Sequence, residues 1–188
     1  MKALVTGGAR SGKSSFAERL CMSRAPGACY IATAQAYDME MKERIALHRV
    51  ERESAGYDWQ TLEEAQALPE LLHRLGGDQA SQPSPAPMVL VDCLTLWLSN
   101  VLLAAGEDGE AASRAAMDEL AAAVEQYPGQ LVIVTNEVGD GIVPEYPLGR
   151  LYRDLSGVMN QRIARLCDEV FLVTAGIPVE LKQLEYKL

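Results

Sequence analysis

The chain has 188 residues, of which 48% are apolar and 23% are charged, and its formal net charge at neutral pH is −9. This length supports one domain with a substantial core, and the composition excludes a predominantly disordered chain. The acidic balance and the lack of a dense basic run make nucleic acid a poor partner, because such a surface repels phosphate backbones.

Short apolar runs alternate with helical patterns along the chain, which is typical of βαβ units and a mostly parallel sheet. Turn-forming composition predicts an exposed loop at 76–87, and a weak alternation after residue 176 predicts a last edge strand. We therefore expect an α/β fold of the P-loop NTPase type, one domain over residues 1–188 with helices on both faces of the sheet. The expected strands are 3–6, 29–33, 88–91, 131–135 and 170–174, and the expected helices are 13–24, 37–53, 62–75, 94–105, 111–127 and 148–167.

The compartment is predicted from the cysteines and the apolar segments. Four cysteines, at positions 21, 29, 93 and 167, show no C-x-x-C spacing and are interpreted as reduced thiols. The N-terminus lacks a signal-peptide pattern, and the apolar stretches fall short of the roughly 18 residues that span a bilayer. We expect a cytoplasmic protein without stable membrane insertion.

A glycine-rich loop is the strongest local signal. It fits G-x-x-x-x-G-K-[ST] between an expected strand and an expected helix, the context in which this pattern binds phosphates. Glycines let backbone N–H groups turn toward phosphate oxygens, Lys13 reaches the β- and γ-phosphates, and the Ser14 hydroxyl coordinates Mg²⁺. The alternative is an ordinary βα turn. The loop consists of Gly7, Gly8, Ala9, Arg10, Ser11, Gly12, Lys13 and Ser14.

An apolar strand that ends in Asp92 has the Walker B arrangement. A carboxylate there would hold Mg²⁺ directly or through water. The alternative is a helix N-cap, because a helix is expected to begin directly afterwards and Asp is a favoured cap.

The chain has two histidines. His48 shares a helical face with Met41 and Ile45, at spacings i, i+4 and i+7, and basic residues follow it. Spacing alone leaves two interpretations open: a nucleophile beside a phosphate site, or a structural histidine on an apolar face. His73 is expected at a helix C-terminus, and we assign it no chemistry.

Four segments in this order carry a resemblance that covers almost the whole chain: GGARSGKS, YIATAQ with RI-x-x-H, TNEVGDGIVP, and NQ-x-x-A. Together they resemble the bifunctional adenosylcobinamide kinase / adenosylcobinamide-phosphate guanylyltransferase family. The resemblance implies that His48 becomes guanylylated by GTP and passes GMP to adenosylcobinamide phosphate. It also implies ATP or GTP as phosphoryl donor, adenosylcobinamide as acceptor and a homotrimer.

The resemblance further implies a set of residues that line the guanine-nucleotide site. Each also has an ordinary structural interpretation: Thr33 ends a strand, Arg49 and Arg52 are solvated, and Glu63 lies in a helix's first turn. The TNEVG segment is expected to form a loop at the carboxyl edge of the sheet. The implied nucleotide residues are Thr33, Ala34, Gln35, Arg49, Val50, Glu51, Arg52 and Glu63, together with Asp92.

Two other functions compete with this interpretation. A monofunctional small-molecule kinase would phosphorylate its acceptor without forming a covalent GMP adduct. A regulatory P-loop protein would bind partners according to its nucleotide state, but the Asn-Lys-x-Asp guanine motif of such switches is missing.

Overall fold

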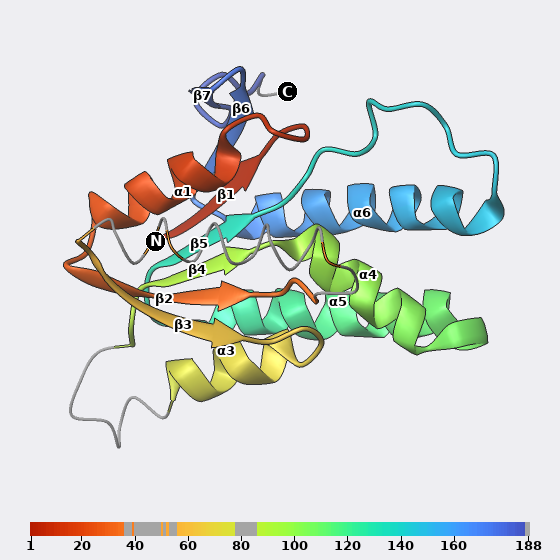
Figure 1. Ribbon diagram of the computed structural model, residues 1–188, viewed down its shortest axis with the longest axis horizontal. Helices are drawn as coiled ribbons and strands as arrows, with labels where there is room; N and C mark the ends of the chain where they lie inside the picture. Colours follow the sequence, from red (N-terminus) through yellow and green to blue (C-terminus); the bar gives the residue numbers. More distant parts are fainter. Residues whose placement is uncertain (36–38, 40–49, 51, 53–55, 78–85, 187–188) are drawn as a thin grey trace.

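A computed structural model describes the chain apart from residues 36–38, 40–49, 51, 53–55, 78–85 and 187–188. Within this described part of the chain, seven strands form one sheet in the order β3-β2-β4-β5-β1-β6-β7 (Figure 1). The first six strands are parallel, and β7 runs antiparallel to β6. The strands are β1 (Lys2–Thr6), β2 (Gly27–Ala32), β3 (Asp58–Glu63), β4 (Val89–Asp92), β5 (Leu131–Val134), β6 (Glu169–Thr174) and β7 (Ile177–Glu180).

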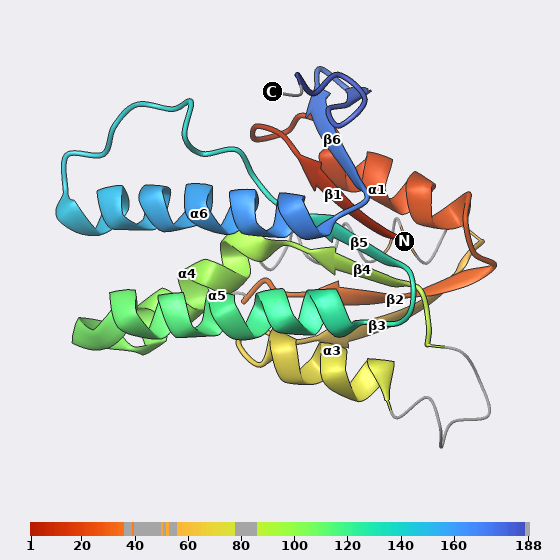
Figure 2. The same ribbon diagram turned by 180° about the vertical axis from the view of Figure 1, so that it is seen from behind.

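The helices connect successive strands and cover both faces of the sheet. Figure 2 shows α3, α4, α5 and α6 in front of the sheet, with α1 on its far side. Among the described residues, no helix combines the length and the hydropathy of a membrane span. The helices are α1 (Lys13–Met22), α3 (Leu68–Gly76), α4 (Leu94–Ala104), α5 (Gly109–Gln126) and α6 (Pro147–Leu166), with a short 3₁₀ turn η1 (Gly106–Asp108).

Two cores lie on the two faces of the sheet because successive strand side chains point to opposite sides. On β1, Leu4 belongs to the cluster that packs against α3 to α6, whereas its neighbours Ala3 and Val5 belong to the cluster beneath α1. All three are at most 1% exposed. The expected α/β fold with helices on both faces is therefore confirmed, and buried strands explain why these segments read as short continuous apolar runs.

One helix prediction was wrong at its start. The helix expected over 62–75 begins at Leu68, and the residues before it form strand β3. Among the described residues this strand lies at the edge of the sheet and pairs with β2 alone. Trp59 and Leu62 are half-buried and its other four side chains are exposed, so its sequence stays largely polar. Pro69 marks the first turn of the true helix. Glu63 consequently ends a strand and does not lie in a helix.

The remaining described elements follow the predictions closely. Helix α6 was expected at 148–167 and is found at Pro147–Leu166, and the expected edge strand at the C-terminus is β7. All four cysteines are buried and unpaired, as predicted. Most of the helix expected at 37–53 and most of the loop expected at 76–87 lie outside the described residues.

Candidate active site

The predicted site residues gather at the carboxyl edge of the sheet, because all the parallel strands end there. Strand register places Glu63 beside Ala32, Ala32 beside Asp92, and Asp92 beside Val134. The P-loop follows β1, and one strand, β5, separates β1 from the strand that carries Asp92. Ligands of open α/β sheets bind along this edge.

The P-loop needs glycine at two positions for steric reasons. A Cβ on Gly7 would stand 2.4 Å from the carbonyl oxygen of Val173, and a Cβ on Gly12 would stand 3.2 Å from Cα of Gly176. Gly12 also has a φ of 91° and caps the start of α1. The loop is thus pressed against the turn between β6 and β7, where the Gly176 N–H donates to the carbonyl oxygen of Ser11 at 2.8 Å.

Two polar side chains of the loop carry donor groups that a phosphate ligand could use. Lys13 is 9% exposed, and its Nζ donates to the carbonyl oxygen of Gly8 at 3.1 Å, so the ammonium group lies across the loop. The Ser11 hydroxyl is buried without a hydrogen-bond partner among the described residues. An unpaired buried hydroxyl is costly, and a phosphate oxygen would satisfy it. The loop therefore fits the phosphate chain of a nucleotide.

Asp92 does not cap a helix. Helix α4 begins at Leu94 with Cys93 as its N-cap, and no side chain makes the capping hydrogen bond. The Asp92 carboxylate instead accepts a hydrogen bond from the Tyr30 hydroxyl, with 2.9 Å between the two oxygens. The capping interpretation is therefore wrong.

The residues after β2 form the wall of this edge. Thr33 has no exposed surface, and its hydroxyl accepts from the Cys93 N–H at 2.8 Å and donates to the Cys93 carbonyl at 2.7 Å. The Asn100 amide donates to the Thr33 carbonyl at 2.8 Å. Because both hydrogen bonds of the Thr33 hydroxyl go to the Cys93 backbone, this hydroxyl is not directed to a ligand, and Thr33 contributes to the carboxyl edge of the sheet through its backbone. Ala34 and Gln35, which follow it, are half-buried.

Arg52 is buried, which overturns the interpretation that it is solvated. It is 6% exposed, its guanidinium carbon lies 3.6 Å from the centre of the Tyr30 ring, and a guanidinium nitrogen lies 3.9 Å from the Glu18 carboxylate. Glu63 and Val50 are exposed. The other predicted residues of this segment, His48, Arg49 and Glu51, lie outside the described residues.

The TNEVG segment forms a loop after β5, as expected, and α6 holds it. The Thr135 hydroxyl donates to Oδ1 of Asn160 at 2.7 Å, and Nδ2 of Asn160 donates to the Asn136 carbonyl at 3.1 Å. The Asn136 amide in turn donates to the Thr95 hydroxyl at 2.7 Å. Two of the motifs that carry the family resemblance therefore meet at the carboxyl edge of the sheet.

Sequence reasoning missed Tyr30, Thr95 and Asn100. Each had a detectable signal, because a polar atom inside an apolar segment needs a hydrogen-bond partner when it is buried. Tyr30 lies within the buried strand β2, and the other two lie within the largely apolar helix α4. The signal identifies a group that needs a partner but does not identify the partner.

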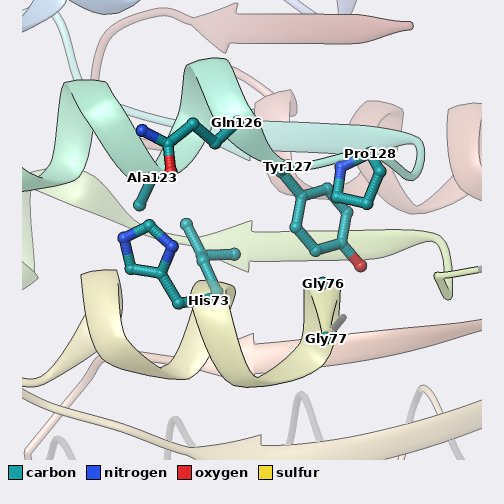
Figure 3. Close-up of a pocket in the computed structure, with 8 residues that line it drawn as sticks. His73, Gly76, Gly77, Ala123, Gln126, Tyr127 and Pro128 are labelled. Carbon is teal, nitrogen blue, oxygen red and sulfur yellow. The ribbon is translucent and has the colours of Figure 1, made fainter. Parts of the chain in front are cut away.

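A separate cavity of about 190 Å³ lies at the amino edge of the sheet, between the C-terminal ends of α3 and α5 (Figure 3). His73 and Gln126 are in its wall, and Tyr127 donates from its hydroxyl to the Pro87 carbonyl at 2.7 Å just before β4. Helix C-termini present carbonyl oxygens and disfavour anions. This cavity is therefore a poor phosphate site, and it places His73 away from the P-loop.

Comparison with known proteins decides the family. The family model described as cobinamide kinase / cobinamide phosphate guanyltransferase matches residues 3–181. The chain belongs to this family. It is thus a bifunctional enzyme, a kinase and a nucleotidyltransferase of cobalamin biosynthesis, as the sequence motifs indicated.

Curated relatives support the same family over nearly full length. The chain is 43% identical to the bifunctional adenosylcobalamin biosynthesis protein CobP of Pseudomonas aeruginosa, covering 97% of this chain and 98% of the relative. It is 42% identical to the bifunctional adenosylcobalamin biosynthesis proteins CobU of Escherichia coli and Salmonella typhimurium, covering 97% of this chain and all of each relative. The match to this family therefore extends from the P-loop through the last strands.

Proposed function

We propose that the carboxyl edge of the sheet binds the nucleotide for both reactions. The enzyme phosphorylates the aminopropanol hydroxyl of adenosylcobinamide with ATP or GTP, then transfers GMP from GTP to give adenosylcobinamide-GDP. One observation carries this proposal: the P-loop, which the Lys13 side chain crosses to reach the Gly8 carbonyl, lies at the same carboxyl edge of the sheet as Asp92. Both family activities act on nucleotide phosphates, which this edge is built to hold.

In the phosphoryl step the protein positions groups and neutralises charge. Lys13 and the loop N–H groups hold the β- and γ-phosphates, and the N-terminus of α1 adds favourable partial charge. The donor oxygens of Ser14 and Asp92 suit Mg²⁺, which prefers oxygen ligands and neutralises charge on the transferred group. Among the described residues no cluster of three or more His, Cys, Asp or Glu side chains could hold a metal alone, so phosphate oxygens and water would complete the coordination.

In the guanylyl step His48 is the nucleophile. An imidazole nitrogen attacks the α-phosphorus of GTP, a P–N bond forms, the bond to the β-phosphate oxygen breaks and pyrophosphate leaves. A phosphate oxygen of adenosylcobinamide phosphate then attacks the same phosphorus, the P–N bond breaks and the imidazole is released. The chain has two histidines, and the position of His73 beside the amino-edge cavity favours His48.

The guanine-nucleotide contacts remain those that the family resemblance implies. Ala34 and Gln35 at the end of β2 and Glu63 at the end of β3 lie along the carboxyl edge, which supports their inclusion. Thr33 contributes as part of the wall and Arg52 through its contact with the Tyr30 ring, since both are buried. Arg49, Val50 and Glu51 complete the proposed set.

We also propose that the enzyme is a cytoplasmic homotrimer. Four buried, unpaired cysteines suit a reducing compartment. The segment before and at the start of α6 leaves apolar side chains exposed, among them Ile142 at 97%, Tyr146 and Leu148. Exposed apolar groups of this kind are typical of surfaces that another chain covers. Light scattering after size exclusion should give a mass of three chains, and a monomer mass would contradict the proposal.

The kinase half is tested by transfer of labelled γ-phosphate to adenosylcobinamide. Lys13→Ala should lower kcat/KM by about 100-fold or more, the usual cost of removing a group that stabilises transition-state charge. Arg19→Ala is the matched control, because Arg19 is an exposed cation in the last turn of the same helix. Lys13→Ala enzyme that transfers phosphate at the control rate would contradict the assignment.

A further inference from the structure

Tyr30 bridges two strands at the candidate active site. It pairs with Leu90 in the β2–β4 register. Because Leu90 lies two residues before Asp92, the side chains of Tyr30 and Asp92 are on the same face of the sheet. Its hydroxyl lies 2.9 Å from Oδ2 of Asp92. The side chain is only 6% exposed, so the phenol makes this hydrogen bond inside the protein.

Neighbouring side chains fix the Tyr30 ring in place. The Arg52 guanidinium lies over its face at 3.6 Å, a cation–π arrangement. Trp59 contacts the ring at 90°, with 5.9 Å between ring centres, and Tyr57 packs against Trp59 at 4.8 Å. With face and edge both packed, the hydroxyl has little freedom to move away from Asp92.

The direction of the hydrogen bond follows from the two groups. A phenol hydroxyl has a proton to donate, whereas an ionised carboxylate has only acceptor oxygens, so Tyr30 donates and Asp92 accepts. A donor on one carboxylate oxygen restricts rotation of the group and leaves the other oxygen for a ligand.

We propose that Tyr30 is a positioning residue, which orients the Asp92 carboxylate for the metal–nucleotide complex. This inference rests on the proposed role of Asp92 as a metal ligand. Removing a partner that orients a metal ligand typically lowers metal affinity by about 10-fold to 100-fold.

The test measures binding and does not depend on turnover. The protein is titrated against a fluorescent, non-hydrolysable GTP analogue, once with Mg²⁺ and once with EDTA. The ratio of the two Kd values gives the gain in nucleotide affinity that is due to the metal. Tyr30→Phe, which keeps the ring and removes the hydroxyl, should reduce that gain by about 10-fold. Tyr57→Phe is the matched control, because the Tyr57 hydroxyl donates to the Ala25 carbonyl at 3.0 Å within the same aromatic cluster.

Asp92→Asn separates the two claims. If this variant keeps the full gain, the proposed metal role of Asp92 fails, and the role of Tyr30 fails with it. If Asp92→Asn loses the gain while Tyr30→Phe keeps it, the inference about Tyr30 alone is overturned. An equal loss in Tyr57→Phe would also overturn it, since that result indicates general loosening. Adding Tyr30→Phe to Asp92→Asn should change nothing further, because the hydroxyl then has no carboxylate to orient.

Discussion

The Thr135 hydroxyl lies 2.7 Å from Oδ1 of Asn160, and this contact joins residues 25 positions apart in the sequence. It attaches the loop after β5 to the middle of α6, and the other end of the Asn160 amide holds the Asn136 carbonyl. Thr135 has no exposed surface, so these polar groups depend on each other for their hydrogen bonds. The contact therefore fixes the loop after β5, at the carboxyl edge of the sheet, against α6.

Asn160→Ala should lower the free energy of unfolding by about 1–3 kcal/mol, because it leaves a buried hydroxyl and a carbonyl without partners. Urea denaturation measures this change. Gln161→Ala is the control, since Gln161 is the exposed neighbour on the same helix, and its effect should stay within about 0.5 kcal/mol. Equal effects from the two substitutions would show that the Asn160 contacts contribute little.

The two glycines at the start of the P-loop should differ in their tolerance of a methyl group. Gly7→Ala forces a Cβ to within 2.4 Å of the Val173 carbonyl, whereas a Cβ at Gly8 meets nothing within 4 Å. We expect Gly7→Ala to cost about 1–3 kcal/mol of stability, the usual cost of strained backbone, and Gly8→Ala to cost far less. Thermal unfolding without nucleotide compares them, and a stable Gly7→Ala protein would contradict this loop geometry.

The adjacent residues Ser14 and Ser15 allow the proposed metal ligand, Ser14, to be compared with a neighbouring serine that has no such role. Ser14→Ala should weaken the Mg²⁺ dependence of nucleotide binding by about 10-fold, because it removes a hydroxyl proposed to coordinate the ion. Ser15→Ala should leave it unchanged, as Ser15 is exposed on the next position of α1. If Ser15→Ala has the larger effect, the register of the P-loop on the phosphates is different.

Stability should fall at high pH because of the buried thiols. Burial raises the pKa of Cys21 and of Cys167 to about 12 and of Cys29 to about 11, from an ordinary value of 9.0. A raised pKa in the folded state means that the thiols of the unfolded chain lose their protons first as pH rises. The stabilisation that the protonated thiols give the folded state is therefore complete below pH 9 and is lost as pH rises toward 12. Urea midpoints at pH 8 and 10.5 test this.

The same urea midpoints measured for Cys167→Ala show whether the buried thiols cause the pH dependence. Removing one thiol should make the fall in stability between the two pH values shallower than in the wild type. The same fall in both proteins would assign the pH dependence to other groups.

Local patterns predicted the parts of the site that depend on local sequence. The P-loop has a fixed spacing, and Asp92 ends a buried apolar strand, so both could be placed without a structure. Strand β3 was missed because only two of its six side chains are half-buried, which leaves it little apolar content, and its acidic end is typical of a helix start. Only the sheet, through pairing with β2, makes that segment a strand.

Contacts between distant segments could not be predicted. Nothing in the sequence around Arg52 indicates that its charge is buried against an aromatic ring, because that requires β2 to lie alongside. Asn160 was recognisable as part of a family motif, yet its partner Thr135 is on another element. Such pairings depend on the order of strands and helices in space, which periodicity does not contain.

A covalent GMP adduct on His48 distinguishes the proposed guanylyltransferase from a simple kinase, and labelling detects such an adduct. The protein is incubated with Mg²⁺ and GTP labelled at the α-phosphate, then denatured and assayed for label on the chain. We expect label that is lost in acid and retained in base, as a phosphoramidate requires. The label should be absent from His48→Ala and present in His73→Ala. An unlabelled wild-type chain that still binds GTP, or label that survives in His48→Ala, would contradict the proposed role of His48.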